Sequence, residues 1–201
     1  MHIPQPKFSQ NDKQDIIDAL GQLIQQPTAT DSPPCPNCQR TDTGDLGCSY
    51  SCENAPTALS EEPDKFQIEP SVVPLVFELT TLRLVQTCWS CEGHTSVNGE
   101  ILKMPQVSFY AEKPVYAQLI SQYVNELYIK KKLQYPWEVA LSDYRQTLQV
   151  IYILKCNTSA INEINLDILQ QDLLIMAENL SNEIKNLALK FLMRIDNRTC
   201  N

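Results

Sequence analysis

The chain has 201 residues, of which 43% are hydrophobic and 20% charged, a composition typical of a globular protein with a sizeable core. Its formal net charge of −8 argues against nucleic-acid binding, because an acidic chain repels a phosphate backbone. The longest apolar stretch, residues 72–85, is interrupted by Pro74, Glu78 and Arg83, which argues against a membrane span. The first residues lack the apolar segment of a secretory signal, so we expect a cytoplasmic protein.

The first predicted element is an amphipathic helix over residues 11–26. Its apolar side chains recur with helical spacing, and Pro27 would end it; the stripe consists of Ile16, Ile17, Leu20, Leu23 and Ile24. We assign residues 1–30 to an N-terminal helical segment that packs on the rest of the chain.

Residues 26–70 are acidic, rich in Pro, Thr, Ser and Asn, and too poor in large apolar residues to form a core of their own. Closely spaced cysteines offer a way to order this segment, because a short turn can deliver two thiolates to one ion. In a reducing compartment such pairs indicate a metal rather than disulfides. The sequence predicts zinc, with seven candidate ligands: Cys35, Cys38, Cys48, Cys52, Cys88, Cys91 and His94.

Seven ligands do not divide into sites of four, and several arrangements stay open. A closed structural site is the favoured one, with two of the cysteine pairs around one ion. Alternatively, Cys88, Cys91 and His94 hold a second ion, with a fourth ligand from a distant residue such as Cys156, Asp143 or Glu112. If water takes that fourth position the site is catalytic, with Glu92 or Glu112 as the base. An iron–sulfur centre or another metal is a further alternative.

The region around the third cysteine pair is similar in outline to a zinc ribbon. Residues 72–87 are rich in Val, Leu, Phe and Thr and predict a long strand. The Cys-Trp-Ser-Cys turn follows, and Asn98-Gly99 then lies between two short alternating runs, which is a strong hairpin signal. A metal-binding turn at the base of a hairpin is the ribbon arrangement. We therefore assign residues 31–104 to a zinc-ribbon-like, Cys-rich module with its hairpin.

Residues 105–160 predict a β-α-β unit. Strands are expected at 106–111 and 137–141, with a helix opened by Pro114 and ended by Pro136 between them. A further strand is favoured within residues 145–155. The two strands of the unit should run parallel, so that polar residues at their C-terminal ends meet in a cleft. The members of this possible cleft are Tyr110, Glu112, Ser142, Asp143, Tyr144 and Arg145, and surface salt bridging is the simpler alternative for them.

The last segment, residues 161–201, predicts a long helix. Its apolar residues follow a near-heptad spacing at Leu169, Leu173, Met176, Leu180, Ile184, Leu187 and Phe191. This seam either docks on the body of the protein or pairs two copies in a homodimer.

Together these patterns predict an α+β protein in which a zinc-ribbon-like module joins a small mixed sheet and a long C-terminal helix, all in one compact unit. The favoured function is non-catalytic, with structural zinc ordering an acidic surface that binds a protein partner. A zinc-dependent hydrolase with an open Cys-Cys-His site is the alternative.

Overall fold

The computed structural model describes residues 10–25, 67–142, 150–157 and 163–197. The predicted ligands Cys35, Cys38, Cys48 and Cys52 lie outside these ranges, as do Asp143, Tyr144 and Arg145. The predicted N-terminal helix is confirmed as α1, Gln10–Gln25. It lies alongside the last helix of the chain, and Tyr116 Oη donates a hydrogen bond of 3.1 Å to Ala19 O.

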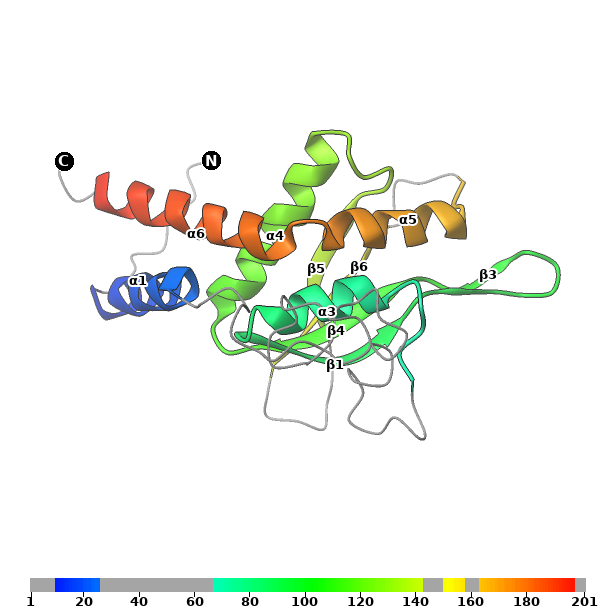
Figure 1. The fold of residues 1–201 in the computed structure, drawn as a ribbon, viewed down its shortest axis with the longest axis horizontal. Coiled ribbons are helices and arrows are strands. Elements are labelled where there is room, and N and C mark those ends of the chain that lie inside the picture. Colours follow the sequence, from blue (N-terminus) through cyan, green and yellow to red (C-terminus); the bar gives the residue numbers. More distant parts are fainter. Residues whose placement is uncertain (1–9, 26–66, 143–149, 158–162, 198–201) are drawn as a thin grey trace, which may run out of the picture.

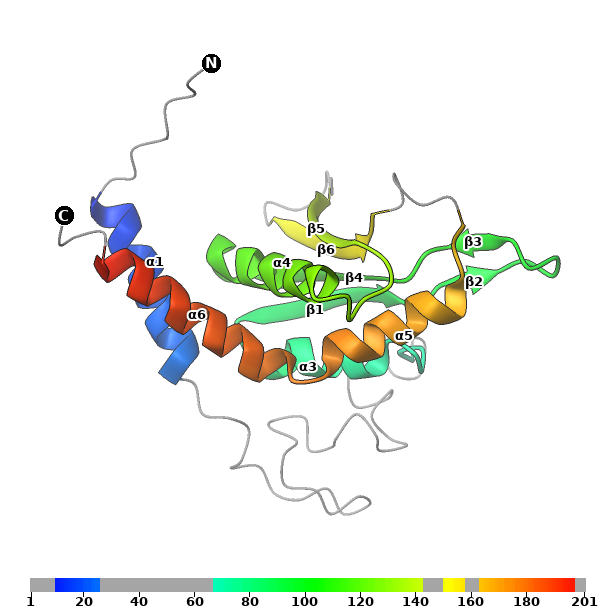
Figure 2. The same cartoon turned by 90° about the horizontal axis from the view of Figure 1, so that it is seen from above.

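Four strands form the main sheet, in the order β1 (Val85–Cys91), β4 (Gln106–Ala111), β6 (Ile151–Cys156) and β5 (Trp137–Ser142). Every hydrogen-bonded pair in it is antiparallel. The predicted hairpin is confirmed as β2 (His94–Thr95) and β3 (Ile101–Lys103), and it projects from one end of the body (Figures 1 and 2). Gly99 turns this hairpin with a φ of 82°, a conformation that glycine adopts without a steric cost.

The predicted mixed sheet is wrong, because all neighbouring strands of the four-stranded sheet are antiparallel. Helix α4 (Pro114–Ile129) does connect β4 to β5, and the two strands do run parallel, since both are antiparallel to β6. They are not neighbours, however, because β6 lies between them. Tyr110 and Ser142 both pair with Ile151, so their backbones are separated by two strand spacings, roughly 10 Å.

The strand predicted over residues 72–87 is also wrong for most of its length. Residues 73–81 form helix α3 (Val73–Thr81), with Pro74 in its first turn, and only the end of the stretch belongs to β1. Six of the nine residues of α3 are buried: Val73, Pro74, Leu75, Val76, Phe77 and Leu79. A helix covered on nearly all sides shows no 3.6-residue period, and its β-branched and aromatic residues then resemble a buried strand.

The predicted C-terminal helix is divided into α5 (Leu166–Ala177) and α6 (Leu180–Asn197). Asn179 adopts a φ of 59° at the break, which a short polar side chain tolerates better than most. The seam residues Leu169, Leu173, Met176, Leu180, Ile184 and Leu187 nevertheless lie in the chain's own core. The alternative that this C-terminal region pairs two copies in a homodimer stays a prediction.

One hydrophobic core joins the helices to one face of the main sheet. Val107 pairs with Leu154, and Trp137 pairs with Cys156; all four side chains are buried on that face. Helices α3 and α4 pack on the sheet, and α5 and α6 pack against these helices (Figure 2). None of the helices in the described ranges is both long and apolar enough to cross a membrane.

Candidate metal site

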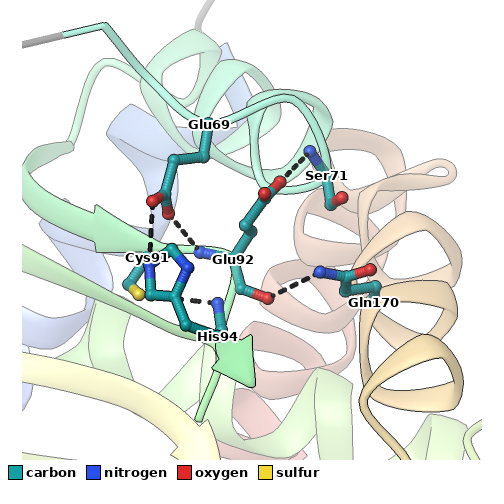
Figure 3. A network of polar contacts seen from close by, with 7 residues as sticks. Glu69, Ser71, Cys91, Glu92, His94 and Gln170 are labelled. Atoms are coloured by element: carbon teal, nitrogen blue, oxygen red, sulfur yellow. Dashed lines mark hydrogen bonds and ion pairs between the residues drawn. The ribbon is translucent and has the colours of Figure 1, made fainter. Parts of the chain in front are cut away.

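A cluster of three possible metal ligands lies at the base of the projecting hairpin (Figure 3). Cys91 is the last residue of β1, His94 is the first residue of β2, and Glu69 precedes α3. The Cys91 sulfur, a His94 ring nitrogen and a Glu69 carboxylate oxygen all lie within 4.8 Å of one another. Zinc bound by such atoms has bonds of about 2.0–2.3 Å, so this spacing suits a shared ion after small side-chain adjustments.

Reciprocal hydrogen bonds hold the two chain segments of the cluster together. The Glu69 carboxylate accepts from Glu92 N at 2.7 Å, and the Glu92 carboxylate accepts from Ser71 N at 2.8 Å. Gln170 of α5 donates to the Glu92 carbonyl oxygen at 3.1 Å (Figure 3). Each carboxylate therefore ties its own segment to the other, and α5 supports the turn from outside.

Glu69 also makes a direct contact with the imidazole. One carboxylate oxygen lies 2.9 Å from His94 Nε2 while the other accepts the Glu92 N–H. These contacts bring the Glu69 carboxylate and the His94 ring together at one point.

Gly93 produces the sharp turn that brings Cys91 and His94 to the same side. Its φ is 88°, and a Cβ atom there would lie 2.5 Å from Leu166 Cδ1 and 2.9 Å from Pro105 Cδ. Only glycine fits this position without strain or displacement of its neighbours. Gly93 N also donates to the Cys91 sulfur at 3.4 Å, an interaction that favours the thiolate over the thiol.

The electrostatic balance at Cys91 opposes a free thiolate. Burial raises the pKa of Cys91 above its ordinary value, and the Glu69 carboxylate raises it further, although the Gly93 N–H and Lys103 act in the opposite direction. A divalent cation between Cys91 and Glu69 would attract both the thiolate and the carboxylate. It would therefore favour the ionised form of Cys91 despite the nearby negative charge.

The cluster is closed on one side and open on the other. Cys91 is only 2% exposed, whereas the side chains of His94 and Glu69 are 48% and 32% exposed. An ion could therefore reach the site from solvent and retain one position for water or for a fourth ligand.

Two of the seven predicted ligands, Cys91 and His94, thus come together, and Cys88 lies outside their cluster. Both cysteines are within β1 rather than on either side of a turn. Thr87 pairs with Phe109 and Trp89 with Ser108, so Cys88 is the extra residue of a β-bulge, and it is exposed. The zinc-ribbon turn expected at these cysteines is therefore not formed in the described structure.

Glu69 was not among the predicted ligands. It lies 22 residues before Cys91, in a stretch that reads as an acidic linker, and no local pattern marks it. The hydrogen bond to Glu92 N that positions it exists only after the two segments pack.

The possible polar cleft lies at the other end of the sheet. Glu112 N donates to Leu84 O, close to the start of β1, whereas the metal cluster lies at the end of that strand. Within the described part of the cleft, Tyr110 and Glu112 are separated from Ser142 by β6.

Comparisons with known proteins found no match: no protein-family model fits the chain, and no curated protein or solved structure is significantly similar to it.

Proposed function

We propose that the protein binds a zinc ion through Glu69, Cys91 and His94, and that the ion has a structural role. In this role it fastens the segment before α3 to the turn from which the β2–β3 hairpin projects. The observation that carries the proposal is the convergence of three ligand atoms within 4.8 Å. The reduced thiol that such a site needs agrees with the cytoplasmic location predicted from the sequence.

The donor set favours zinc over the other common divalent cations. Calcium and magnesium prefer oxygen ligands, whereas a thiolate and an imidazole beside one carboxylate match the ligands of zinc. The Gly93 N–H on the Cys91 sulfur and the Glu92 N–H on the Glu69 carboxylate provide the outer interactions that metal ligands usually have.

A structural role is favoured because neither base proposed for hydrolysis is placed to act. The Glu92 carboxylate accepts a hydrogen bond from Ser71 N, which holds it against the backbone. Cys91 pairs with Gln106 at the start of β4, whereas Glu112 lies just beyond the other end of this six-residue strand. Glu112 is therefore roughly 15–20 Å from Cys91.

The hairpin above the site has the character of a protein-contact surface. Val97 is fully exposed near its tip, and Leu102 on β3 is 70% exposed. Lys103 lies over the ring of the partly exposed Trp89, 4.2 Å from its centroid. Exposed apolar side chains on a projecting element mark interaction sites, and an ion at the base would limit the hairpin's motion before a partner binds.

Metal content of matched cysteine variants tests this proposal. We expect Cys91→Ser to contain one zinc fewer per chain than the wild type by elemental analysis, and Cys88→Ser, three residues away on the same strand, to keep the full amount. Cobalt substitution provides a second measurement, because a thiolate bound to Co²⁺ gives a charge-transfer absorption, and this absorption should be weaker in Cys91→Ser than in the wild type. Equal metal content and equal spectra for Cys91→Ser and the wild type would exclude the site.

The predicted set Cys35, Cys38, Cys48 and Cys52 can be separated from this site by the same method. A variant with all four replaced by serine should still bind the ion held by Cys91. If that variant binds none while Cys91→Ser binds normally, the zinc belongs to the N-terminal cysteines instead.

The alternative function is zinc-dependent hydrolysis, and the exposed side of the cluster is the observation that favours it. A hydrolase would lose turnover of activated ester or phosphoester substrates in His94→Ala while it keeps its fold. Under the structural proposal, His94→Ala instead lowers the thermal stability of the zinc-loaded chain, and no such turnover is present in the wild type.

A further inference from the structure

Helix α5 meets the turn of residues 91–94 through two side chains that lie one helical turn apart. Leu166 and Gln170 are four residues apart and therefore share one face of the helix. Leu166 packs on Gly93, since a Cβ atom added to this glycine would lie 2.5 Å from Leu166 Cδ1. Gln170 Nε2 donates to Glu92 O at 3.1 Å (Figure 3). The first half of α5 thus forms one wall of the turn that carries two of the proposed zinc ligands.

The carbonyl that Gln170 holds belongs to the same peptide group as the N–H on the sulfur. The bond between Glu92 and Gly93 is trans, so its C=O and its N–H lie in one plane and point in opposite directions. On one side Gln170 donates to the carbonyl oxygen, and on the other Gly93 N donates to Cys91 Sγ at 3.4 Å. Rotation of this plane would turn the N–H away from the sulfur. A donor that fixes the carbonyl therefore also fixes the hydrogen bond to Cys91.

The other hydrogen bonds of Glu92 do not act on this peptide group. The Glu69 carboxylate accepts from the N–H of Glu92, and the Glu92 carboxylate accepts from Ser71 N. Both leave the plane after Glu92 free to rotate, and Gly93, with a φ of 88° and no side chain, imposes few steric limits on it. The orientation of this plane therefore depends on a donor from outside the turn, which Gln170 supplies.

Gln170 is well placed for this role because α5 is anchored independently of the turn. The Asn165 side chain caps the helix by accepting from two backbone N–H groups of its first turn, at 2.8 and 3.2 Å. Leu169 and Leu173, on either side of Gln170, have no exposed surface, and neither has Asp172. A polar group on so rigid an element can position a site more precisely than one on a loop.

We infer that Gln170 is a positioning residue for the metal site: through the Glu92–Gly93 peptide it holds an N–H on the Cys91 thiolate, and it thereby makes zinc affinity depend on the docking of α5. The inference rests on the proposed function, because it requires an ion bound by Cys91. Outer hydrogen-bond partners of metal ligands typically change metal affinity by about 10–100-fold. The dependence is reciprocal, so bound zinc must stabilise the docked helix by the same factor that docking adds to zinc affinity.

Two matched substitutions on α5 test this role in the full-length chain. Gln170→Met keeps the length of the side chain but removes the donor, and it should weaken zinc binding about tenfold. Gln171→Met makes the same change at the next residue, whose side chain is exposed, and it should stay within about twofold of the wild type. Competition with a chromophoric chelator measures both dissociation constants for the ion that Cys91→Ser fails to bind.

The spectrum of the Co²⁺-loaded chain distinguishes positioning from a general loss of stability. A thiolate that loses an N–H donor gives up its electrons more readily, so its charge-transfer band lies at longer wavelength. We expect this shift in Gln170→Met and not in Gln171→Met, for the part of the absorption that Cys91→Ser loses. A variant that only unfolds more easily would lose intensity and keep the band where it is.

Hydrogen exchange tests the reciprocal effect on the wild type, so the inference can be checked even if Gln170→Met does not fold. Zinc should slow exchange of the amides at the first hydrogen-bonded positions of α5, Leu169 and Gln170, by about threefold or more. Amides of α1, at the end of the molecule opposite the hairpin, serve as the control and should be unchanged (Figures 1 and 2).

The possible failures separate the inference from the proposed function. If zinc depends on Cys91 but Gln170→Met and Gln171→Met share one affinity and one spectrum, the inference is wrong and the metal site remains. Zinc that leaves exchange in α5 unchanged also excludes the coupling. If the wild type and Cys91→Ser bind zinc equally, both the site and the role of Gln170 are excluded.

Discussion

Two carboxylates in this protein tie distant segments together, and they do so in opposite environments. Asp172 of α5 has no exposed surface and accepts from three donors, Gln134 N, Tyr135 N and Trp137 Nε1, at 3.0–3.1 Å. Glu69 is 32% exposed and meets one backbone N–H and one imidazole. Both residues join parts of the chain more than 20 residues apart.

The two carboxylates differ in whether their oxygens can still bind a further partner. The oxygens of Asp172 are enclosed by donors, so this carboxylate can stabilise the fold but has no room for a cation. Glu69 shares its open side with a sulfur and a ring nitrogen, which are the atoms a soft cation needs. A fully satisfied buried carboxylate is thus structural, whereas a half-exposed one beside soft donors can bind.

The largest expected effect is at Asp172. Asp172→Ala leaves three donors without their partner, one of them buried and two partly buried, and we expect a loss of about 3–5 kcal/mol in the free energy of unfolding, measured by urea titration. Asp167→Ala, an exposed change on the same helix, should cost less than about 1 kcal/mol and is the control. A loss below about 1 kcal/mol for Asp172→Ala would show that the enclosed carboxylate is not a major link.

Unfolding at alkaline pH provides a second test of the buried region around Asp172. Burial raises the pKa of Cys156 from its ordinary 9.0 to about 12, and the negative charges of Asp172 and Glu138 contribute. The unfolded chain therefore releases this proton first, so the stability contribution is complete below pH 9 and is lost as the pH rises toward 12. The expected slope is about 1.4 kcal/mol per pH unit.

Cys156→Ala should flatten this decline, although Tyr116, whose pKa burial also raises to about 12, leaves a residual slope. Urea titrations between pH 9 and pH 12 measure both slopes. If the two proteins lose stability in parallel, Cys156 does not ionise later in the folded state.

Gly93, at the base of the hairpin, can be compared with two other glycines, Gly99 and Gly21. Gly93→Ala adds a Cβ against Leu166 and Pro105 at a φ of 88°, and we expect it to lower the free energy of unfolding by about 2–3 kcal/mol and to weaken zinc binding. Gly99→Ala has a similar φ of 82° but open space around it, so it should cost about 1 kcal/mol.

Gly21→Ala lies within α1 with nothing near the added carbon, and it should stabilise the protein by about 0.5–1 kcal/mol. Equal losses at Gly93 and Gly99 would mean that the contacts with Leu166 and Pro105 relax freely. Thermal and urea unfolding of the three variants decide this.

The smallest effect is expected at Glu69 without metal. In the chelated protein, Glu69→Gln should change the free energy of unfolding by less than about 1 kcal/mol, because its ion pair with His94 is partly solvated. In the presence of zinc the same variant should lose clearly more. Glu92→Gln retains an acceptor for Ser71 N and serves as the matched control. An equal effect of Glu69→Gln with and without zinc would remove Glu69 from the ligand set.

Several elements were predictable because their signals are local. Each of these signals lies within a few residues of the structure that it specifies. They are the helical stripe of α1, Pro114 at the start of α4, Asn98-Gly99 in the hairpin, and the alternating residues of β4 and β6. The C-terminal apolar spacing also identified the buried side chains correctly. It could not show the break at Asn179, since the same spacing continues through both helices.

The candidate metal site was only partly predictable. Cys91 and His94 are three residues apart, so their association depends on one short turn and on the conformational freedom of Gly93. Cys88 fits the same sequence pattern, yet it lies in the bulge of a strand and is exposed. Spacing alone cannot distinguish a turn that gathers two cysteines from a strand that separates them.

The sequence by itself determined the α+β class, most helix and strand positions, and two of the three clustered ligands, because short-range periodicity and turn chemistry encode them. The tertiary structure decided that residues 73–81 form a helix, that β6 lies between β4 and β5, and that Glu69 meets Cys91 and His94. These features depend on packing between segments far apart in the chain. The free energy of that packing overrides local preference and leaves no local pattern in the sequence.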